Sequence, residues 1–124
     1  METNNHHFWW ERPTWERKSN FHKKIVRNPG YIIPMPPELH NRGTESLHAN
    51  LRPIPLISIR SAKELERLTR DIDPDDYLNN IDFAIGVLVE LDEWKTVDNL
   101  LQQRPYIVKA LEGTSNASQQ KMAE

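Results

Sequence analysis

The sequence predicts an α+β fold, in which a small module at residues 1–58 packs on a helical segment at residues 59–112. Its length of 124 residues is about that of one domain. Apolar residues in the second half recur at the three- and four-residue spacing of helices. The first half instead holds seven of the nine prolines and a short apolar run typical of a strand. Residues 113–124 are small and polar, and we expect them to form a disordered tail.

The composition excludes several kinds of chemistry. The chain has no cysteine, which removes disulfides, thiolate nucleophiles, iron–sulfur clusters and cysteine-based zinc sites. No apolar run approaches the roughly 20 residues of a membrane span, and no signal-peptide core follows Met1. We therefore expect a cytoplasmic protein without a membrane partner.

Charge is unevenly distributed along the chain. Residues 1–60 carry nine basic and five acidic residues, a balance of +4, whereas residues 61–124 carry seven basic and thirteen acidic residues, a balance of -6. A basic half joined to an acidic half indicates a part that faces nucleic acid. Ordinary surface variation explains an excess of this size equally well.

Three helices are predicted in the second half. Ser61 and Glu64 form a capping box, and Leu65 and Leu68 follow at helical spacing. The pair Asp73-Pro74 is expected to end this helix and to begin another, because both residues favour a helix N-terminus.

The next apolar stripe, over residues 77–91, predicts the most buried helix of the chain. Gly86 within it costs roughly 1 kcal/mol relative to alanine unless close packing requires a glycine. Residues 94–101 form a third amphipathic stretch, and Pro105 interrupts it or begins a last short helix.

The first half combines short elements with unusual residues. Residues 15–27 are expected to form one helix, residues 28–30 a turn, residues 31–35 a strand and residues 54–59 an extended segment. His22 on the first helix is expected to be exposed or to face phosphate. Trp9, Trp10 and Trp15 are interpreted as core residues, with a base-stacking platform or a protein-binding hot spot as the alternative.

The histidines of this half follow a recognisable order. His6 and His7 are adjacent, Asn28 precedes the strand, and His40 and His48 lie in the region after it. This order resembles the HNH (His-Me finger, ββα-metal) family, and more narrowly the small HNH-like proteins of phages and mobile elements. The resemblance covers about residues 5–55. It implies that the first module is a ββα-metal-like unit with one divalent metal ion, either Zn, Mg, Mn or Ni.

The resemblance also implies a role for each of these residues. His7 would be the general base and Asn28 the residue that orients it. His6, His48 and His40 would be the metal ligands. Hydrolysis of a phosphodiester needs a base for the attacking water and a cation at the leaving oxygen, and imidazole can serve either purpose.

The spacing of the last two histidines is a difficulty for this interpretation. On one continuous helix from Pro36 onward, His40 and His48 would be separated by roughly 12 Å of rise and ~80° of rotation. Two side chains so placed cannot share a metal with bonds of ~2.1 Å. Either Gly43 breaks the helix, or only one of the two histidines belongs to the site and Glu45 could replace the other as an oxygen ligand.

The leading hypothesis is an HNH-like protein that binds double-stranded DNA, with metal-dependent phosphodiester hydrolysis, in a bacterial or phage-infected cell. Lys23, Lys24 and Arg27 would then face phosphates. The alternative is a non-catalytic regulator or inhibitor that binds a host protein through the acidic helices or the tryptophan cluster. A third hypothesis is a subunit of a larger assembly that docks through the proline-rich residues 34–37 and 52–55.

Overall fold

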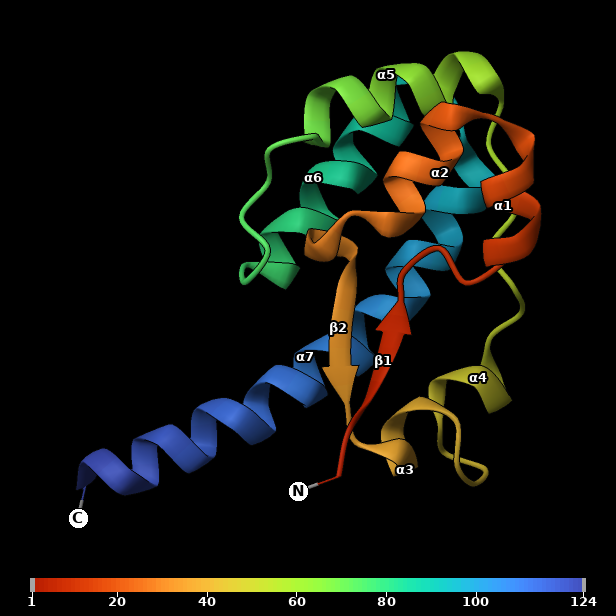
Figure 1. Cartoon of the computed structure of the whole chain (residues 1–124). Coiled ribbons are helices and arrows are strands. Elements are labelled where there is room, and N and C mark those ends of the chain that lie inside the picture. The colour runs from red at the N-terminus through yellow and green to blue at the C-terminus, as the bar shows by residue number, and fades with distance from the viewer. Residues whose placement is uncertain (1, 124) are drawn as a thin grey trace.

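The computed structural model describes the backbone of residues 2–123 and the side chains of residues 2–112. It confirms the predicted α+β class, since helices surround one small antiparallel sheet (Figure 1). The side chains of the predicted disordered tail, residues 113–124, lie outside the described part, whereas the backbone of residues 113–123 continues helix α7. In chain order the elements are β1 (Asn4–His7), α1 (Arg12–Lys18), α2 (Asn20–Arg27), the 3-10 turn η1 (Pro29–Tyr31), β2 (Ile32–Met35), α3 (Pro37–His40), α4 (Leu47–Asn50), α5 (Ile59–Thr69), α6 (Tyr77–Glu90) and α7 (Trp94–Ala123).

The sheet separates two groups of helices. Strand β1 pairs with β2 in an antiparallel register that sets His6 opposite Ile33 and His7 opposite Ile32. Helices α1, α2, α5 and α6 lie beyond one end of the strands, and α3 and α4 lie at the other end (Figure 1). Helix α7 runs past the sheet and contacts β2. The two strands therefore connect the helical part of the chain to the short helices α3 and α4.

Aromatic residues form the centre of the core. Trp9, Trp15 and Tyr31 are fully buried, and the ring of Trp9 lies 5.0 Å from that of Trp15 and 5.3 Å from that of Tyr31. Trp10 is half-buried and packs against this core. The predicted core role of the tryptophans is thus confirmed for Trp9 and Trp15, while Trp10 lies at its edge.

The helix predicted over residues 15–27 is two helices. Ser19 between α1 and α2 has extended backbone angles (φ -161°, ψ 166°), and its hydroxyl accepts the backbone N–H of His22. A serine side chain at this position caps the N-terminus of α2. The cap explains why the chain begins a new helix here rather than continuing α1.

The predicted boundaries of α5 and α6 are wrong by a few residues. Ser58, rather than Ser61, caps α5, because its hydroxyl accepts the backbone N–H of Ser61. Helix α6 begins at Tyr77 rather than at the Asp73-Pro74 pair. The Asp73 carboxylate accepts the backbone N–H of Asp75, which stabilises a local turn before the helix begins.

Helix α7 continues through Pro105, contrary to the predicted interruption. Proline removes one helical hydrogen bond. Leu100 and Ile107 on either side of it are both fully buried, so packing against the core favours a continuous helix. Among the described residues, no helix is long and apolar enough to cross a membrane.

Candidate metal centre

Three histidines from three separate elements converge beside the sheet. His6 lies on β1, His40 ends α3 and His48 lies on α4. One ring nitrogen from each lies within 4.8 Å of one ring nitrogen of the others. The ring centroid of His6 is 5.1 Å from that of His40 and 5.3 Å from that of His48. The structure thus brings together the three residues that the sequence analysis named as metal ligands.

A reversal of the chain at Gly43 places His40 and His48 side by side. Gly43 has a φ of +88°, a conformation that favours glycine. Its carbonyl accepts the hydroxyl of the buried Ser46 at 2.8 Å. Of the two predicted alternatives, the one in which Gly43 breaks the helix is confirmed, since His40 and His48 lie on the separate helices α3 and α4. The break brings the two Nε2 atoms to 3.0 Å, and Glu45 in the turn is exposed and outside the cluster.

The protonation state of His6 is set by Gln103 of α7. The amide nitrogen of Gln103 donates to the carbonyl of Phe8 at 2.9 Å and to the side-chain oxygen of Asn99 at 2.7 Å. Its oxygen therefore accepts from His6 Nε2, at 2.8 Å. With its proton on Nε2, His6 carries an unshared electron pair on Nδ1. That Nδ1 atom is buried and has no hydrogen-bond partner in the described part of the chain.

Asn4 acts on His40 as Gln103 acts on His6. The side-chain oxygen of Asn4, two residues before His6 on β1, accepts from His40 Nδ1. The electron pair of His40 is then on Nε2, which faces Nε2 of His48. Metal-bound histidines characteristically donate their other ring N–H to an oxygen in this way, because the bond holds the ring in its binding orientation.

Burial keeps these imidazoles neutral. The pKa of His6 is lowered to about 3, chiefly by loss of solvation; the hydrogen bond to Gln103 opposes the shift, and the neighbouring His40 and His48 add to it. Burial also lowers the pKa of His40 to about 4 and moves the pKa of His48 below its usual value. Metal ions bind neutral imidazole, so protons compete little for these nitrogens at neutral pH.

The spacing of the nitrogens fits one transition-metal ion. Bonds of ~2.0–2.1 Å in tetrahedral geometry place two ligand nitrogens roughly 3.3 Å apart. The 3.0 Å separation of the His40 and His48 Nε2 atoms is close to this value. The limit of 4.8 Å that includes the His6 nitrogen is wider than this value, so the three rings would have to move closer together to bind one ion. Three imidazoles are also the protein ligands of one class of zinc site that keeps a fourth position for water or substrate.

An aromatic side chain covers part of the cluster. The Trp10 ring centroid lies 4.8 Å from that of His48 and 5.7 Å from that of His6. Trp10 is half-buried, so its indole is in contact with the imidazoles and is also partly exposed to solvent. Its fluorescence is therefore a natural reporter of events at the cluster.

Among the described residues, no hydrogen bond joins the two residues assigned to catalysis, His7 and Asn28. Strand β1 is regular, so His7 points to the opposite face from His6. His7 is half-buried, and burial followed by the charge of Arg12 lowers its pKa. Asn28 caps η1 by accepting the backbone N–H of Gly30, and its amide donates to the carbonyl of Thr69. These bonds give Asn28 a structural role, and both of its partners are residues other than His7.

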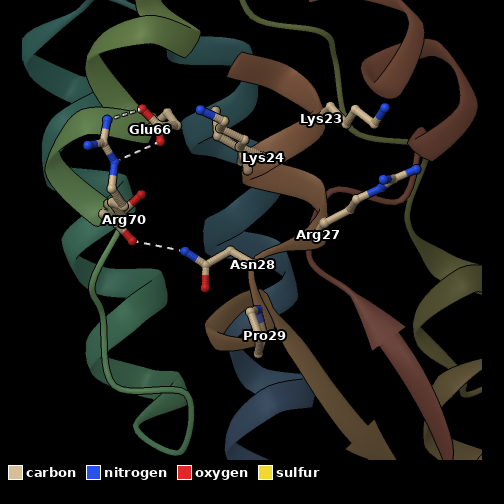
Figure 2. Close-up of a pocket in the computed structure, with 9 residues that line it drawn as sticks. Lys23, Lys24, Arg27, Asn28, Pro29, Glu66 and Arg70 are labelled. Carbon is tan, nitrogen blue, oxygen red and sulfur yellow. Dashed lines mark hydrogen bonds and ion pairs between the residues drawn. The ribbon is translucent and has the colours of Figure 1, made fainter. Parts of the chain in front are cut away.

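The three predicted phosphate-facing residues lie on α2, beyond the other end of β2 from the cluster. They line a pocket of about 640 Å³ together with Glu66 and Arg70 of α5. Figure 2 shows Lys24 extending toward Glu66, whereas Lys23 and Arg27 extend to the other side of α2. Glu66 is 5% exposed and holds Arg70 by two hydrogen bonds of 2.9 Å. Three cations therefore lie along the surface of α2, although they do not converge on one point.

Sequence reasoning missed several partners of the histidines. Gln103 is 97 residues from His6, and a glutamine on an amphipathic helix carries no signal of such a role. The expectation that His22 is exposed is wrong. Its ring is fully buried, where Nε2 donates to the carbonyl of Ile57 at 2.9 Å and Nδ1 bonds the Ser19 hydroxyl.

No known protein family, curated protein sequence or solved structure matches this chain. We therefore interpret the cluster from its own geometry.

Proposed function

We propose that this chain binds one divalent transition-metal ion, preferably Zn²⁺, through His6, His40 and His48, and that it acts on nucleic acid as an HNH-like protein. The observation that carries the proposal is the buried, unpartnered Nδ1 of His6 beside two facing Nε2 atoms. A buried nitrogen of this kind is costly unless something binds it. A metal ion would bind this nitrogen together with the two Nε2 atoms, in place of the hydrogen bond that joins those two.

The charge of the centre favours an anionic substrate. The cluster contains three neutral imidazoles and no carboxylate among the described residues. The charge of a bound dication is therefore left uncompensated, in a site where burial already penalises charge. A phosphate oxygen in the fourth position would offset it. When bound, the ion would supply Lewis acidity toward a phosphodiester, the chemistry expected from the resemblance.

The chain's own residues supply the other parts of this proposal. The resemblance assigns His7 as the base: burial lowers its pKa, so it is neutral near physiological pH and could accept a proton from water, although it lies on the opposite face of β1 from His6. Lys23, Lys24 and Arg27 offer positive charge to a double-stranded DNA backbone. We place the protein in the cytoplasm of a bacterial or phage-infected cell, where such a substrate is accessible.

Metal binding is tested with chelator-stripped protein. Zn²⁺ titration by calorimetry should give one site per chain, and Co²⁺ should develop the visible absorption of a low-coordinate complex. Binding of Ni²⁺ should quench emission from Trp10, which a Trp10→Phe variant would identify. Substitution of His6, His40 or His48 by alanine should abolish stoichiometric binding, whereas His7→Ala should preserve it.

The outcome that would overturn the metal centre is equal Zn²⁺ affinity in wild type and His48→Ala. Absence of any Zn²⁺ binding by folded wild type would have the same force. His22→Gln is the matched control, because it removes a buried imidazole that lies outside the cluster, where its ring nitrogens bond to Ser19 and Ile57.

Hydrolysis is tested separately by nicking of supercoiled plasmid DNA with Mg²⁺, Mn²⁺, Ni²⁺ or Zn²⁺. Wild type should nick the plasmid with at least one metal. His7→Ala should be inactive although it still binds the ion. If wild type and His7→Ala are equally inert with every metal, the enzymatic part fails and the metal centre stands.

DNA binding is tested by gel shift across a salt series. A Lys23→Ala/Lys24→Ala variant should bind more weakly, and its salt slope should fall by about 0.9 for each phosphate that is no longer neutralised. Lys63→Ala on α5 is the control for removal of an exposed cation. If Lys63→Ala weakens DNA binding as much as the Lys23→Ala/Lys24→Ala variant does, α2 has no specific role in DNA binding.

A further inference from the structure

A second surface feature, separate from the metal centre, is a groove between α5 and α6 that is lined largely by apolar residues. Its volume is about 470 Å³, and its lining includes Leu68, Phe83, Gly86, Val87 and Leu91. Phe83 is 46% exposed and Leu68 40% exposed, which places them among the large apolar side chains that the described chain leaves open to solvent. Contiguous exposed apolar surface of this kind typically marks an interaction site.

Packing inside the chain does not explain why residue 86 in the groove is a glycine. Within a helix, glycine is less stable than every residue except proline. A Cβ added to Gly86 would meet no atom within 4 Å, and its φ is not in the left-handed region. At Gly30, by contrast, an added Cβ would lie 2.6 Å from Ile72 Cδ1. Packing inside the chain therefore requires glycine at residue 30 but not at residue 86.

The absence of a side chain at Gly86 lowers the floor of the groove. It lets another backbone approach α6 closely, which is a common use of glycine. Since nothing within the described chain approaches Gly86, the approaching backbone would belong to another molecule.

The charged residues that line the groove are acidic, which favours a positively charged partner. Glu64, Asp82 and Glu90 contribute to the lining, and no basic residue does. Glu64 is paired with Arg67 and Asp82 with Arg104, whereas no ion pair joins Glu90 to another described residue. A second copy docking by the same face would set carboxylates against carboxylates, which disfavours a two-fold dimer here.

We infer that this groove docks one amphipathic helix of a partner protein, with apolar side chains on one face and lysine or arginine along its edges. An apolar helix face lying in a groove between two helices is a recurrent mode of recognition. The close approach at Gly86 seats the helix, Leu68 and Phe83 cover its apolar face, and Glu90 meets a basic side chain. This interaction is independent of the metal centre.

The probe is a synthetic 18-residue helix with leucine on one face and lysine on the flanks, labelled for fluorescence anisotropy. Controls are the same peptide with glutamate replacing lysine and a scrambled lysine peptide. The lysine peptide should bind wild type at least tenfold more tightly than either control. Amide chemical-shift changes should be centred on residues of α5 and α6.

Variants of the protein distinguish docking from general attraction. Phe83→Ser and Leu68→Ser should each weaken binding at least tenfold. Ile59→Ser is the matched control, because Ile59 is 48% exposed on the same helix as Leu68 but does not line the groove. Gly86→Ala should raise the Tm while weakening peptide binding at least tenfold, a combination that a merely structural glycine would not produce.

Three results would overturn the inference. The first is equal binding of the lysine and glutamate peptides. The second is binding that Gly86→Ala and Phe83→Ser leave unchanged. The third is a concentration-dependent dimer in sedimentation that Phe83→Ser abolishes, since a second copy would then be the occupant.

Discussion

Gln103 provides a sharp test of the metal centre, because it touches a predicted ligand without being one. It is fully buried. Its oxygen accepts from His6 Nε2, and its nitrogen donates to the Phe8 carbonyl and to Asn99. Two substitutions separate these functions: Gln103→Leu removes both, and Gln103→Glu keeps only the acceptor.

The leucine variant should lose metal affinity. Without an acceptor for Nε2–H, nothing holds the His6 proton on the atom that leaves Nδ1 free. Loss of such a partner typically lowers metal affinity 10–100-fold, which is about 1.4–2.7 kcal/mol. The metal-free fold should also weaken, because each buried group left without a partner costs about 1–3 kcal/mol.

The glutamate variant should behave differently. Its carboxylate still accepts from His6 and makes the imidazole a better ligand, so Zn²⁺ affinity should equal or exceed that of wild type. Its metal-free stability should fall, since the carboxylate cannot donate to Phe8 and faces the Asn99 oxygen. Stability and metal affinity therefore change in opposite directions.

The assay combines Zn²⁺ calorimetry with urea unfolding of the chelated protein. Thr96→Val is the control on the same helix, because it removes a buried bond to the Pro55 carbonyl and should lower stability without changing Zn²⁺ affinity. If Gln103→Leu and Gln103→Glu lose affinity equally, Gln103 acts only on the fold and its assigned positioning role is refuted.

Three further predictions concern α2 and the turn η1 that follows it. Burial holds the pKa of His22 below 6.5, so its contribution is complete above the unfolded-state value and is lost as the pH falls from about 6.5 toward the lower folded pKa. Urea unfolding at several pH values should show wild type losing more stability than His22→Gln over that range, and parallel curves would contradict this. Gly30→Ala should lower stability by about 1–3 kcal/mol through the clash with Ile72, and an unchanged urea midpoint would show that Ile72 moves aside. Asn28→Ala should lose about 1–2 kcal/mol through its two hydrogen bonds with unaltered Zn²⁺ affinity, whereas lower affinity in calorimetry would tie Asn28 to the centre.

The helical half was predictable because its signals are local. Each of its three helices carries apolar residues at helical spacing. Four of these residues are fully buried: Leu65 on α5, Ile81 and Leu88 on α6, and Leu100 on α7. A stripe of apolar residues specifies a helix and its inner face without reference to the rest of the chain. The exact ends were harder, since Ser58 and Ser61 are both plausible caps and only packing distinguishes them.

The histidine cluster was predictable only through the family resemblance. Spacing alone argued against a shared site for His40 and His48, and a positive φ at Gly43 resolves the conflict. The partners of His6 could not be predicted, because Gln103 meets it through a contact across 97 residues. Burial of His22 was unpredictable for the same reason, since its carbonyl partner lies 35 residues away.

The contact between His6 on β1 and Gln103 on α7 joins residues that are synthesised at different times. His6, His40 and His48 all leave the ribosome before Gln103, which lies 97 residues after His6. A nascent chain that has exposed only the imidazoles lacks the amide that fixes the His6 tautomer. The proposed centre would therefore take its final form only after Gln103 has been synthesised, because the tautomer of the His6 ring is not fixed before then.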